Sequence, residues 1–181
     1  SFRRYINKTP EFREYFEKNK LKSVSNKTTL RFETPAGKQA QVDWKESMSI
    51  VLNTGEVVEV NIFVYILAYS RFRVYRVSLN KTREILKEFL VNSFEVTGGV
   101  PEEILFDNMK SVMDKSRTRY HEGKVNDEFL EFSKDMGFEV KPCIAARAET
   151  KGKVESPMRI LDELYAYNGD LSYEGLIGKV K

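Results

Sequence analysis

The feature that most constrains the fold is the apolar run V57-V-E-V-N-I-F-V-Y-I-L-A-Y69. The run is too short to cross a bilayer, and Glu59 and Asn61 interrupt it. It instead has the character of a long strand that is buried on both faces, as in sheets that lie between two layers. The chain must therefore cover both sides of a sheet with other elements.

The flanking segments predict two further strands. In Q39-A-Q-V-D-W-K45, apolar residues alternate with polar ones, and Asp43 lies in the middle of the predicted strand on the polar face. The segment R71-F-R-V-Y-R-V-S78 follows the long strand after a short turn. Strands this close in sequence form an antiparallel meander.

The hydrophobic period then changes from two to that of a helix. Asn80 or Thr82 caps a helix that ends at Gly98-Gly99, and Asn126 begins a second helix that Gly137 closes. V100-P-E-E-I-L-F-D-N108 and F138-E-V-K-P-C143 are strands that alternate with these helices. This order predicts an α/β protein with a mixed five-stranded sheet and helices on both faces.

A last helix is predicted after the loop R147-A-E-T150. Its apolar face has helical spacing, but the position of its first residue is ambiguous. Thr150 can cap it, which leaves Pro157 beyond the first turn and costs a hydrogen bond. Ser156 can cap it instead, which places Pro157 at the favoured first position. The apolar face consists of Val154, Met158, Leu161 and Tyr165.

Charge is distributed unevenly along the chain. Residues 1–38 carry a net charge of +6 and the remainder −3, within a total of +3. A basic arm on a weakly acidic domain indicates a polyanionic partner, although a solvated linker has the same composition. We predict a basic helical arm or linker over residues 1–34, a catalytic core over 35–168 and the start of a C-terminal linker over 169–181.

The cysteine and histidine content and the first residues of the chain exclude several classes of protein. The only cysteine, Cys143, cannot form an internal disulfide and suits a reducing compartment. One cysteine and one histidine, His121, are too few for a zinc site. The first residues lack an apolar signal segment, and the absence of an initial Met suggests a piece of a longer polypeptide.

Three carboxylates fall where the predicted elements can bring them together. Asp43 lies on the first strand, Asp107 ends the fourth, and Glu155 lies near the start of the last helix. Three converging acids repel one another unless a cation is present. Oxygen-only ligation suits Mg²⁺ or Mn²⁺, and two such ions support displacement at a phosphodiester.

Each carboxylate also has a purely structural explanation. Glu155 can pair with Lys151 and Arg159 along one helix face, and Asp107-Asn108 is common turn chemistry. Asp43 can be an ordinary exposed strand residue. The combination of three acids on this order of elements favours the metal site.

Three segments resemble the catalytic core of IstA-type insertion-sequence transposases. They are E33-T-P-A-G-K-Q-A-Q-V-D-W-K45, G98-G-V-P-E-E-I-L-F-D-N-M-K110 and T150-K-G-K-V-E155, in the order of that family. The family belongs to the superfamily of DDE transposases and retroviral integrases, which has an RNase H-like fold. The resemblance covers residues 31–166 and implies Asp43, Asp107 and Glu155 as the catalytic triad, which holds two Mg²⁺ ions. It also implies flanking DNA-binding domains outside this chain.

Basic residues near these acids are candidate contacts to DNA phosphates, because cations offset the repulsion between acids and backbone. Asn108 either orients Asp107 or a metal-bound water, or serves only the turn. The candidate phosphate contacts are Lys110, Lys115, Arg117, Arg119, Lys124, Arg147, Lys151, Lys153 and Arg159.

The predicted reaction is metal-dependent cleavage at a transposon 3′ end followed by transfer of the 3′-OH into target DNA. The alternatives are an RNase H-like nuclease without strand transfer and a non-catalytic DNA-binding module. The resemblance implies transposon-end DNA, target DNA and an IstB-type AAA+ ATPase as partners, and a dimer or larger homo-oligomer on paired ends. It also implies a bacterial cytoplasmic location on the nucleoid, with no membrane association.

Overall fold

The computed structural model describes residues 34–118, 120–143 and 161–180. These residues lie in one compact unit, Glu33–Lys181. The predictions for the N-terminal arm and for the start of the last helix, including Pro157, lie outside the described residues. No described helix is long and apolar enough to span a bilayer.

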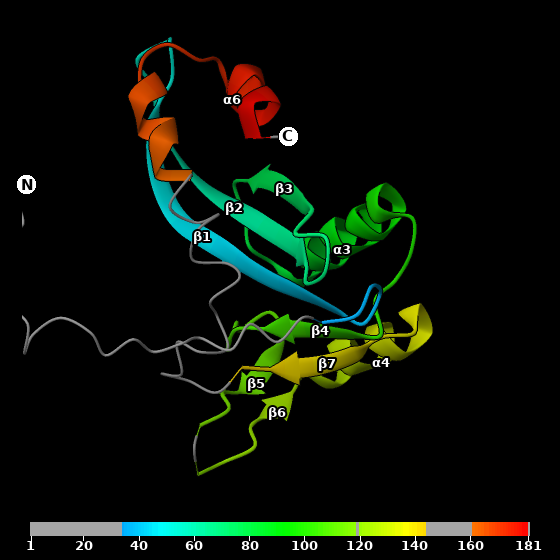
Figure 1. The fold of residues 1–181 in the computed structure, drawn as a ribbon. Coiled ribbons are helices and arrows are strands. Elements are labelled where there is room, and N and C mark those ends of the chain that lie inside the picture. The colour runs from blue at the N-terminus through cyan, green and yellow to red at the C-terminus, as the bar shows by residue number, and fades with distance from the viewer. Residues whose placement is uncertain (1–33, 119, 144–160, 181) are drawn as a thin grey trace, which may run out of the picture. The chain divides into compact units, whose positions relative to one another are not determined.

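A mixed five-stranded sheet forms the centre of this unit, in the order β3-β2-β1-β4-β7 (Figure 1). The first three strands pair antiparallel, whereas β4 and β7 run parallel to β1. This confirms the predicted mixed sheet. The strands are β1 Gln39–Val51, β2 Val57–Leu67, β3 Arg73–Ser78, β4 Glu103–Phe106 and β7 Glu139–Pro142.

Strand β2 is buried on both faces, as its apolar run predicts. Phe63 and Tyr65 belong to one core cluster, and Ile62, Val64 and Ile66 belong to the other. Alternate residues of a strand point to opposite faces, so each cluster occupies one side of the sheet.

Helices α3 (Arg83–Thr97) and α4 (Asp127–Met136) supply the first cluster with Leu86, Phe89 and Phe129. Their ends follow the predicted signals. Thr82, not Asn80, caps α3 by accepting from the Ile85 amide, and Asn126 caps α4. Gly98 and Gly137 close the two helices in the left-handed conformation.

The second cluster is covered by η2 (Asp162–Tyr167) and α6 (Tyr173–Val180), which contribute Leu164, Leu176 and Val180. Helices therefore pack on both faces of the sheet, as predicted. The predicted linker at 169–181 contains α6 instead, because Leu176 and Val180 bury their side chains against the sheet.

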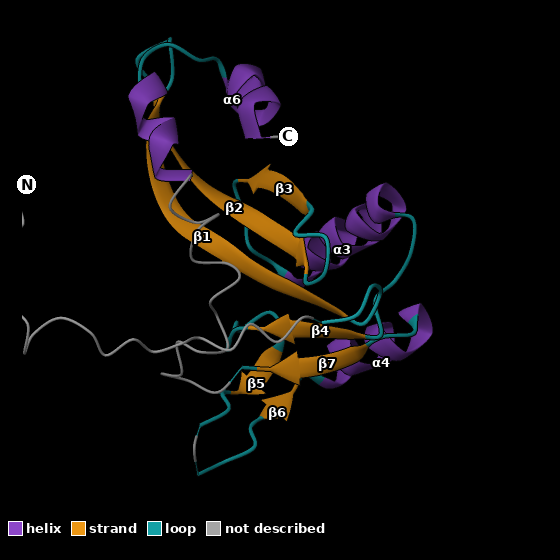
Figure 2. Cartoon of the chain, in the orientation of Figure 1, coloured by secondary structure: helices purple, strands orange, loops and turns teal. Residues whose placement is uncertain are grey.

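Two further details differ from the sequence prediction. The described part of the last predicted helix is the short 3₁₀ segment η2, in which Leu164 is buried and Tyr165 is exposed. The polar stretch after Asp107 contains a hairpin of β5 (Met113–Lys115) and β6 (Lys124–Val125), which was not predicted. Its loop extends away from the five-stranded sheet (Figure 2).

Strand β1 runs six residues beyond its predicted end, through a β-bulge. Lys45 pairs with Ile62 and Met48 with Val60, so β1 has one extra residue here. The bulged residue Ser47 has φ 53°. The buried Asn61 side chain accepts from its amide at 3.2 Å. The extra residue turns Met48 and Ile50 towards the second cluster.

Candidate active site

The parallel pairing of β1 and β4 brings the first two predicted carboxylates to matching positions. Val42 pairs with Phe106 at the end of this ladder, and Asp43 and Asp107 are the next residues of the two chains. Neighbouring strands lie about 4.8 Å apart in the pairing direction. The structure therefore brings together two acids that are 64 residues apart in the sequence.

Both carboxylates lie on the same side of the sheet. Val42 and Phe106 belong to the first cluster, so the residues that follow them point to the opposite face. Val64, the cross-strand partner of Asp43, belongs to the second cluster and supports this assignment. Asp43 and Asp107 are both half-buried, between the apolar core and the surface.

Local hydrogen bonds hold the backbone at both positions. An Asp43 carboxylate oxygen, Oδ1, accepts from the Trp44 amide at 2.9 Å. The Asp107 carbonyl accepts from the Met109 amide at 2.6 Å, and this bond turns the chain immediately after the strand. Trp44 packs against Phe63 with ring centroids 5.1 Å apart, at the border of the first cluster.

The third predicted carboxylate, Glu155, lies outside the described residues. Within the described chain, no three acidic, histidine or cysteine side chains gather closely enough to hold a metal ion. A complete three-carboxylate site is therefore not seen in the described part of the protein.

The chain on either side of residues 144–160 is nevertheless fixed beside the two aspartates. The Cys143 amide donates to the Phe106 carbonyl at 2.8 Å, one residue before Asp107. On the other side, Lys45 Nζ and Asp162 Oδ1 form an ion pair at 2.7 Å. Lys45 lies two residues after Asp43, on the same face of β1.

This anchoring role of Lys45 was not predicted from the sequence. The period of two already places Lys45 on the face of Asp43, which is the signal that could have found it. Its partner could not be found in this way, because Asp162 is 117 residues away in the sequence.

The Asn108 side chain forms two hydrogen bonds with the Arg117 backbone, and its proposed role towards Asp107 or a metal-bound water stays a prediction. Its amide oxygen accepts from the Arg117 amide at 2.8 Å, and its amide nitrogen donates to the Arg117 carbonyl at 3.2 Å. The Arg117 guanidinium in turn donates to the Pro142 carbonyl at the end of β7, at 3.0 Å. Asn108 and Arg117 thus fasten the β5–β6 hairpin to the strand ends.

The candidate phosphate contacts differ in their availability. Lys110 and Lys115 are exposed, whereas Arg117 is half-buried and bound to Pro142. Lys124 pairs with Asp127 at 3.0 Å, and this hydrogen bond raises the pKa of the Lys124 ammonium group. Outside the described residues lie Arg119, Arg147, Lys151, Lys153 and Arg159.

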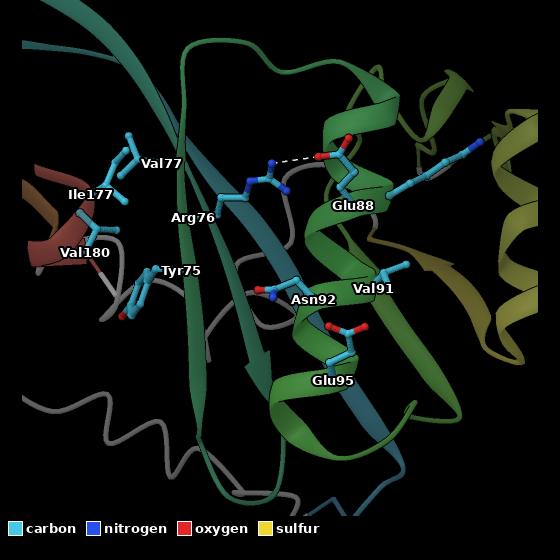
Figure 3. A pocket seen from close by; sticks show the side chains of 10 residues that line it. Tyr75, Arg76, Val77, Glu88, Val91, Asn92, Glu95, Ile177 and Val180 are labelled. Carbon is cyan, nitrogen blue, oxygen red and sulfur yellow. Dashed lines mark hydrogen bonds and ion pairs between the residues drawn. The ribbon is translucent and has the colours of Figure 1, made fainter. Parts of the chain in front are cut away.

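A groove of about 820 Å³ lies elsewhere, between β3, α3 and α6 (Figure 3). Across it, Arg76 and Glu88 form an ion pair at 2.9 Å. Strand β2 separates β3 from the strand that carries Asp43, so this groove is distinct from the carboxylate site. It is lined by Tyr75, Arg76, Val77, Lys87, Glu88, Val91, Asn92, Glu95, Ile177 and Val180.

Sequence comparison relates the chain to bacterial transposases. It is 48% identical to the transposase of insertion sequence element IS232 from Bacillus thuringiensis subsp. berliner, over 97% of this chain and 41% of the relative. It is 41% identical to a putative transposase of IS5376 from Geobacillus stearothermophilus, over 85% of this chain and 38% of the relative. The IS21 transposase of Pseudomonas aeruginosa is 36% identical, over 82% and 37%. The chain thus spans less than half the length of these relatives, and no family model matches it.

Solved structures of similar fold are retroviral integrases. A chain of the simian T-cell lymphotropic virus intasome matches with a TM-score of 0.62 and 15% identity, over 82% of this chain and 48% of that one. The HTLV-2 integrase catalytic core domain, solved in complex with magnesium, matches with a TM-score of 0.56 and 12% identity, over 82% and 86%.

These findings confirm the predicted RNase H-like fold and the relationship to insertion-sequence transposases, whereas the narrower IstA-type assignment stays a prediction. The chain is homologous to one segment of the insertion-sequence transposases and has the fold of a retroviral integrase catalytic core.

Proposed function

We propose that this chain is the catalytic core of a DDE transposase, which cleaves a transposon 3′ end and joins the 3′-OH to target DNA. The observation that carries the proposal is the parallel register of β1 and β4, which sets Asp43 and Asp107 side by side on one face. The sequence relationship to transposases supports the same reaction.

Glu155 is the proposed third carboxylate. Two described anchors flank its segment, the Cys143–Phe106 hydrogen bond and the Lys45–Asp162 ion pair. Glu155 precedes Leu161 by six residues, which span at most about 20 Å when extended. That reach is compatible with a position beside the aspartates.

The donor set fits a hard divalent cation. Two carboxylates on neighbouring strands repel each other, and oxygen-only ligation suits Mg²⁺, or Mn²⁺ as a substitute. Two bound Mg²⁺ ions would supply activation of the attacking oxygen and stabilisation of the leaving oxygen. The HTLV-2 integrase core, of similar fold, was solved with magnesium.

The proposed reaction has two displacements at phosphorus. In the first, water attacks the phosphodiester and the bond to the 3′ oxygen of the transposon end breaks. In the second, that 3′-OH attacks a target phosphodiester and replaces the 3′ oxygen of the target strand. Neither step needs a covalent enzyme intermediate, so the chain's task is to bind and orient the two DNA strands.

Exposed basic residues close to the carboxylates in the sequence are proposed to hold the DNA backbone. Lys110 and Lys115 are exposed and close in sequence to Asp107, so they meet this requirement most directly. The residues predicted outside the described range, from Arg147 to Arg159, keep the same proposed role. Arg117 is better explained as a brace for the hairpin, because its guanidinium is bound to Pro142.

The proposed partners follow from this reaction. They are transposon-end DNA, target DNA, a second copy of the transposase on the paired end, and an IstB-type AAA+ ATPase. The reaction on chromosomal DNA places the protein in the bacterial cytoplasm, on the nucleoid.

A strand-transfer assay tests the proposal. The full-length parent protein is mixed with labelled transposon-end DNA, a plasmid target and Mg²⁺. We expect Asp43→Asn, Asp107→Asn and Glu155→Gln each to lower joined product to less than about one hundredth of wild type while DNA binding persists. Asp135→Asn, on the exposed face of α4, is the matched control and should leave activity unchanged.

The outcomes separate the alternatives. Cleavage without joining by the wild-type protein would identify a nuclease of the same fold. DNA binding with no chemistry at all would identify a binding module. Activity that survives Glu155→Gln would show that Glu155 is not a catalytic residue and would favour the structural explanation, in which it pairs with Lys151 and Arg159.

A further inference from the structure

The tip of the β5–β6 hairpin presents an aromatic side chain to solvent. Tyr120 is 89% exposed, the largest value among the large hydrophobic side chains of the described residues. Tyr69, in the turn after β2, is 64% exposed by comparison. Burial of an aromatic ring is favourable, so a ring held this far from the core is available to a partner.

Hydrogen bonds join Thr118 to Tyr120 and His121 at the tip. The Thr118 amide donates to the His121 carbonyl at 2.9 Å. The Thr118 hydroxyl accepts from the Tyr120 amide at 3.2 Å and from the His121 amide at 3.1 Å. These bonds fix the backbone that carries the tyrosine ring, so less conformational entropy is lost when the ring binds.

The base of the hairpin is attached to the carboxylate site. Asn108, which follows Asp107, forms two hydrogen bonds with the Arg117 backbone, and Arg117 donates to Pro142 at the end of β7. These bonds join the base of the hairpin to the ends of β4 and β7, next to Asp107.

The charge of this region suits a polyanion. Residues 110–124 contain five Lys or Arg and two acids, a net charge of +3. Asp114 is already bound by the Asn126 amide, and Lys110 and Lys115, which precede the tip in the sequence, are exposed. Basic side chains around an exposed aromatic ring are the combination that binds unpaired nucleotides, by phosphate attraction and base stacking.

We infer that Tyr120 stacks on the terminal base of the DNA end that is held in the carboxylate site. The inference rests on the proposed function, because it takes DNA as the partner. A DNA end presents the face of its terminal base directly. An internal base must first be unstacked from the duplex, at a cost of a few kcal/mol. The ring therefore favours the end over the interior.

The test measures stacking directly, in EDTA, where no phosphodiester chemistry consumes the DNA. A linear duplex carries the fluorescent base 2-aminopurine either at its terminus or in its middle, and the 181-residue chain is titrated in. We expect wild type to change the fluorescence of the terminal probe and to leave the central probe unchanged. Tyr120→Ala should abolish the terminal change and weaken binding of the duplex about five-fold or more.

Two variants sharpen the comparison. Tyr120→Trp keeps an aromatic face and should retain the fluorescence change, whereas Tyr69→Ala, at the other end of the sheet from Asp107, should behave as wild type. A terminal signal that persists in Tyr120→Ala would overturn the inference. A signal from the central probe that depends on Tyr120 would also overturn it, in favour of an internal base.

The result is separable from the test of the proposed function. If Tyr120 proves not to stack on the terminal base, the expected effects of Asp43→Asn and Asp107→Asn on strand transfer remain unchanged. Failure of the wild-type 181-residue chain to bind DNA would overturn the stacking inference, whereas the strand-transfer assay with the full-length parent would still decide the proposed function.

Discussion

Single residues set the position of the hairpin relative to the carboxylates. The Asn108 side-chain amide pairs with the Arg117 backbone through two hydrogen bonds. It can take the place of a peptide group from a neighbouring strand, because it has the same kinds of donor and acceptor. Gly123, which immediately precedes β6, lies close to the backbone of Lys115 and Arg117. It has φ 77°, and a Cβ there would lie 2.7 Å from the Lys115 carbonyl oxygen and 2.8 Å from the Arg117 nitrogen.

We therefore expect Gly123→Ala to destabilise the protein. The left-handed backbone costs an alanine about 1–2 kcal/mol, and the backbone clash adds to this because the contacted atoms cannot rotate away. Urea unfolding of the variant should show a fall in the free energy of unfolding of about 2 kcal/mol or more.

Gly55→Ala is the matched control for this effect. Gly55 has φ 83°, but nothing lies within 4 Å of the Cβ that alanine would add. Its loss of stability should be limited to the backbone cost. Equal losses in the two variants would show that the close approach at Gly123 contributes nothing.

At the scale of elements, the bulge in β1 decides which side chains face which layer. In a regular strand without the bulge, Met48 and Ile50 would follow the alternation of Val42 and Trp44 and face the first cluster. With it, they join the second cluster beneath η2 and α6. The same strand can therefore present Asp43 on this face and then close the core with apolar residues.

The backbone at the bulge predicts opposite effects of glycine at two nearby positions. Ser47 has φ 53°, a conformation that a serine adopts only at a cost, so Ser47→Gly should raise the free energy of unfolding by about 0.5–1 kcal/mol. Ser49, an exposed residue in the regular part of β1, is the control. Ser49→Gly should lower the free energy of unfolding by about 0.5–1 kcal/mol. Chemical denaturation measures both, and a loss of stability in Ser47→Gly would contradict the strain at the bulge.

At the scale of the whole described unit, the C-terminal segment is joined to the first strand on the carboxylate face. The Lys45–Asp162 pair is the polar part of this junction, and Leu161, Leu164 and Leu176 form its apolar part. The junction determines where the chain leaves residues 144–160, which contain Glu155.

A charge reversal at one partner of this ion pair should impair catalysis more than folding. We expect Asp162→Lys to reduce strand transfer about ten-fold or more, because small misplacements of catalytic groups are costly. The double variant Lys45→Glu with Asp162→Lys should recover much of the loss. Strand transfer by the full-length parent measures the activity, and thermal unfolding checks the fold.

An ion pair at the opposite end of the parallel ladder provides the control. Lys38 and Glu102 pair at 2.6 Å at the start of β1 and β4, and both are exposed. The charge reversal Glu102→Lys should leave strand transfer unchanged, since ion pairs on the protein surface contribute little to stability. An equal loss at Glu102 and Asp162 would mean that charge alone, and not the junction, governs activity.

Periodicity and end signals were sufficient for much of the fold. The run in β2 required two covering layers, and the alternation in β1 placed Asp43 on a defined face. The helix ends at Thr82, Gly98, Asn126 and Gly137 are local backbone chemistry, which neighbouring residues determine. The predicted strand order allowed the first and fourth strands to be neighbours, and their pairing places Asp43, within β1, beside Asp107, which follows β4.

Other features depend on partners far away in the sequence. The three- and two-residue strands β5 and β6 have no period to detect, and Asn108 and Gly123 hold them by contacts specific to the folded state. Lys45 forms its ion pair with Asp162, which is distant in the sequence. Helix α6 packs its apolar face on the sheet, a contact that the composition of residues 169–181 did not reveal. The sequence by itself determined the strands of the five-stranded sheet, the ends of α3 and α4 and the face on which Asp43 lies, because those depend on local backbone preferences and burial. Only the tertiary structure decided the register between β1 and β4, the bulge and the hairpin, because each is stabilised by hydrogen bonds between residues that the chain brings together only when folded.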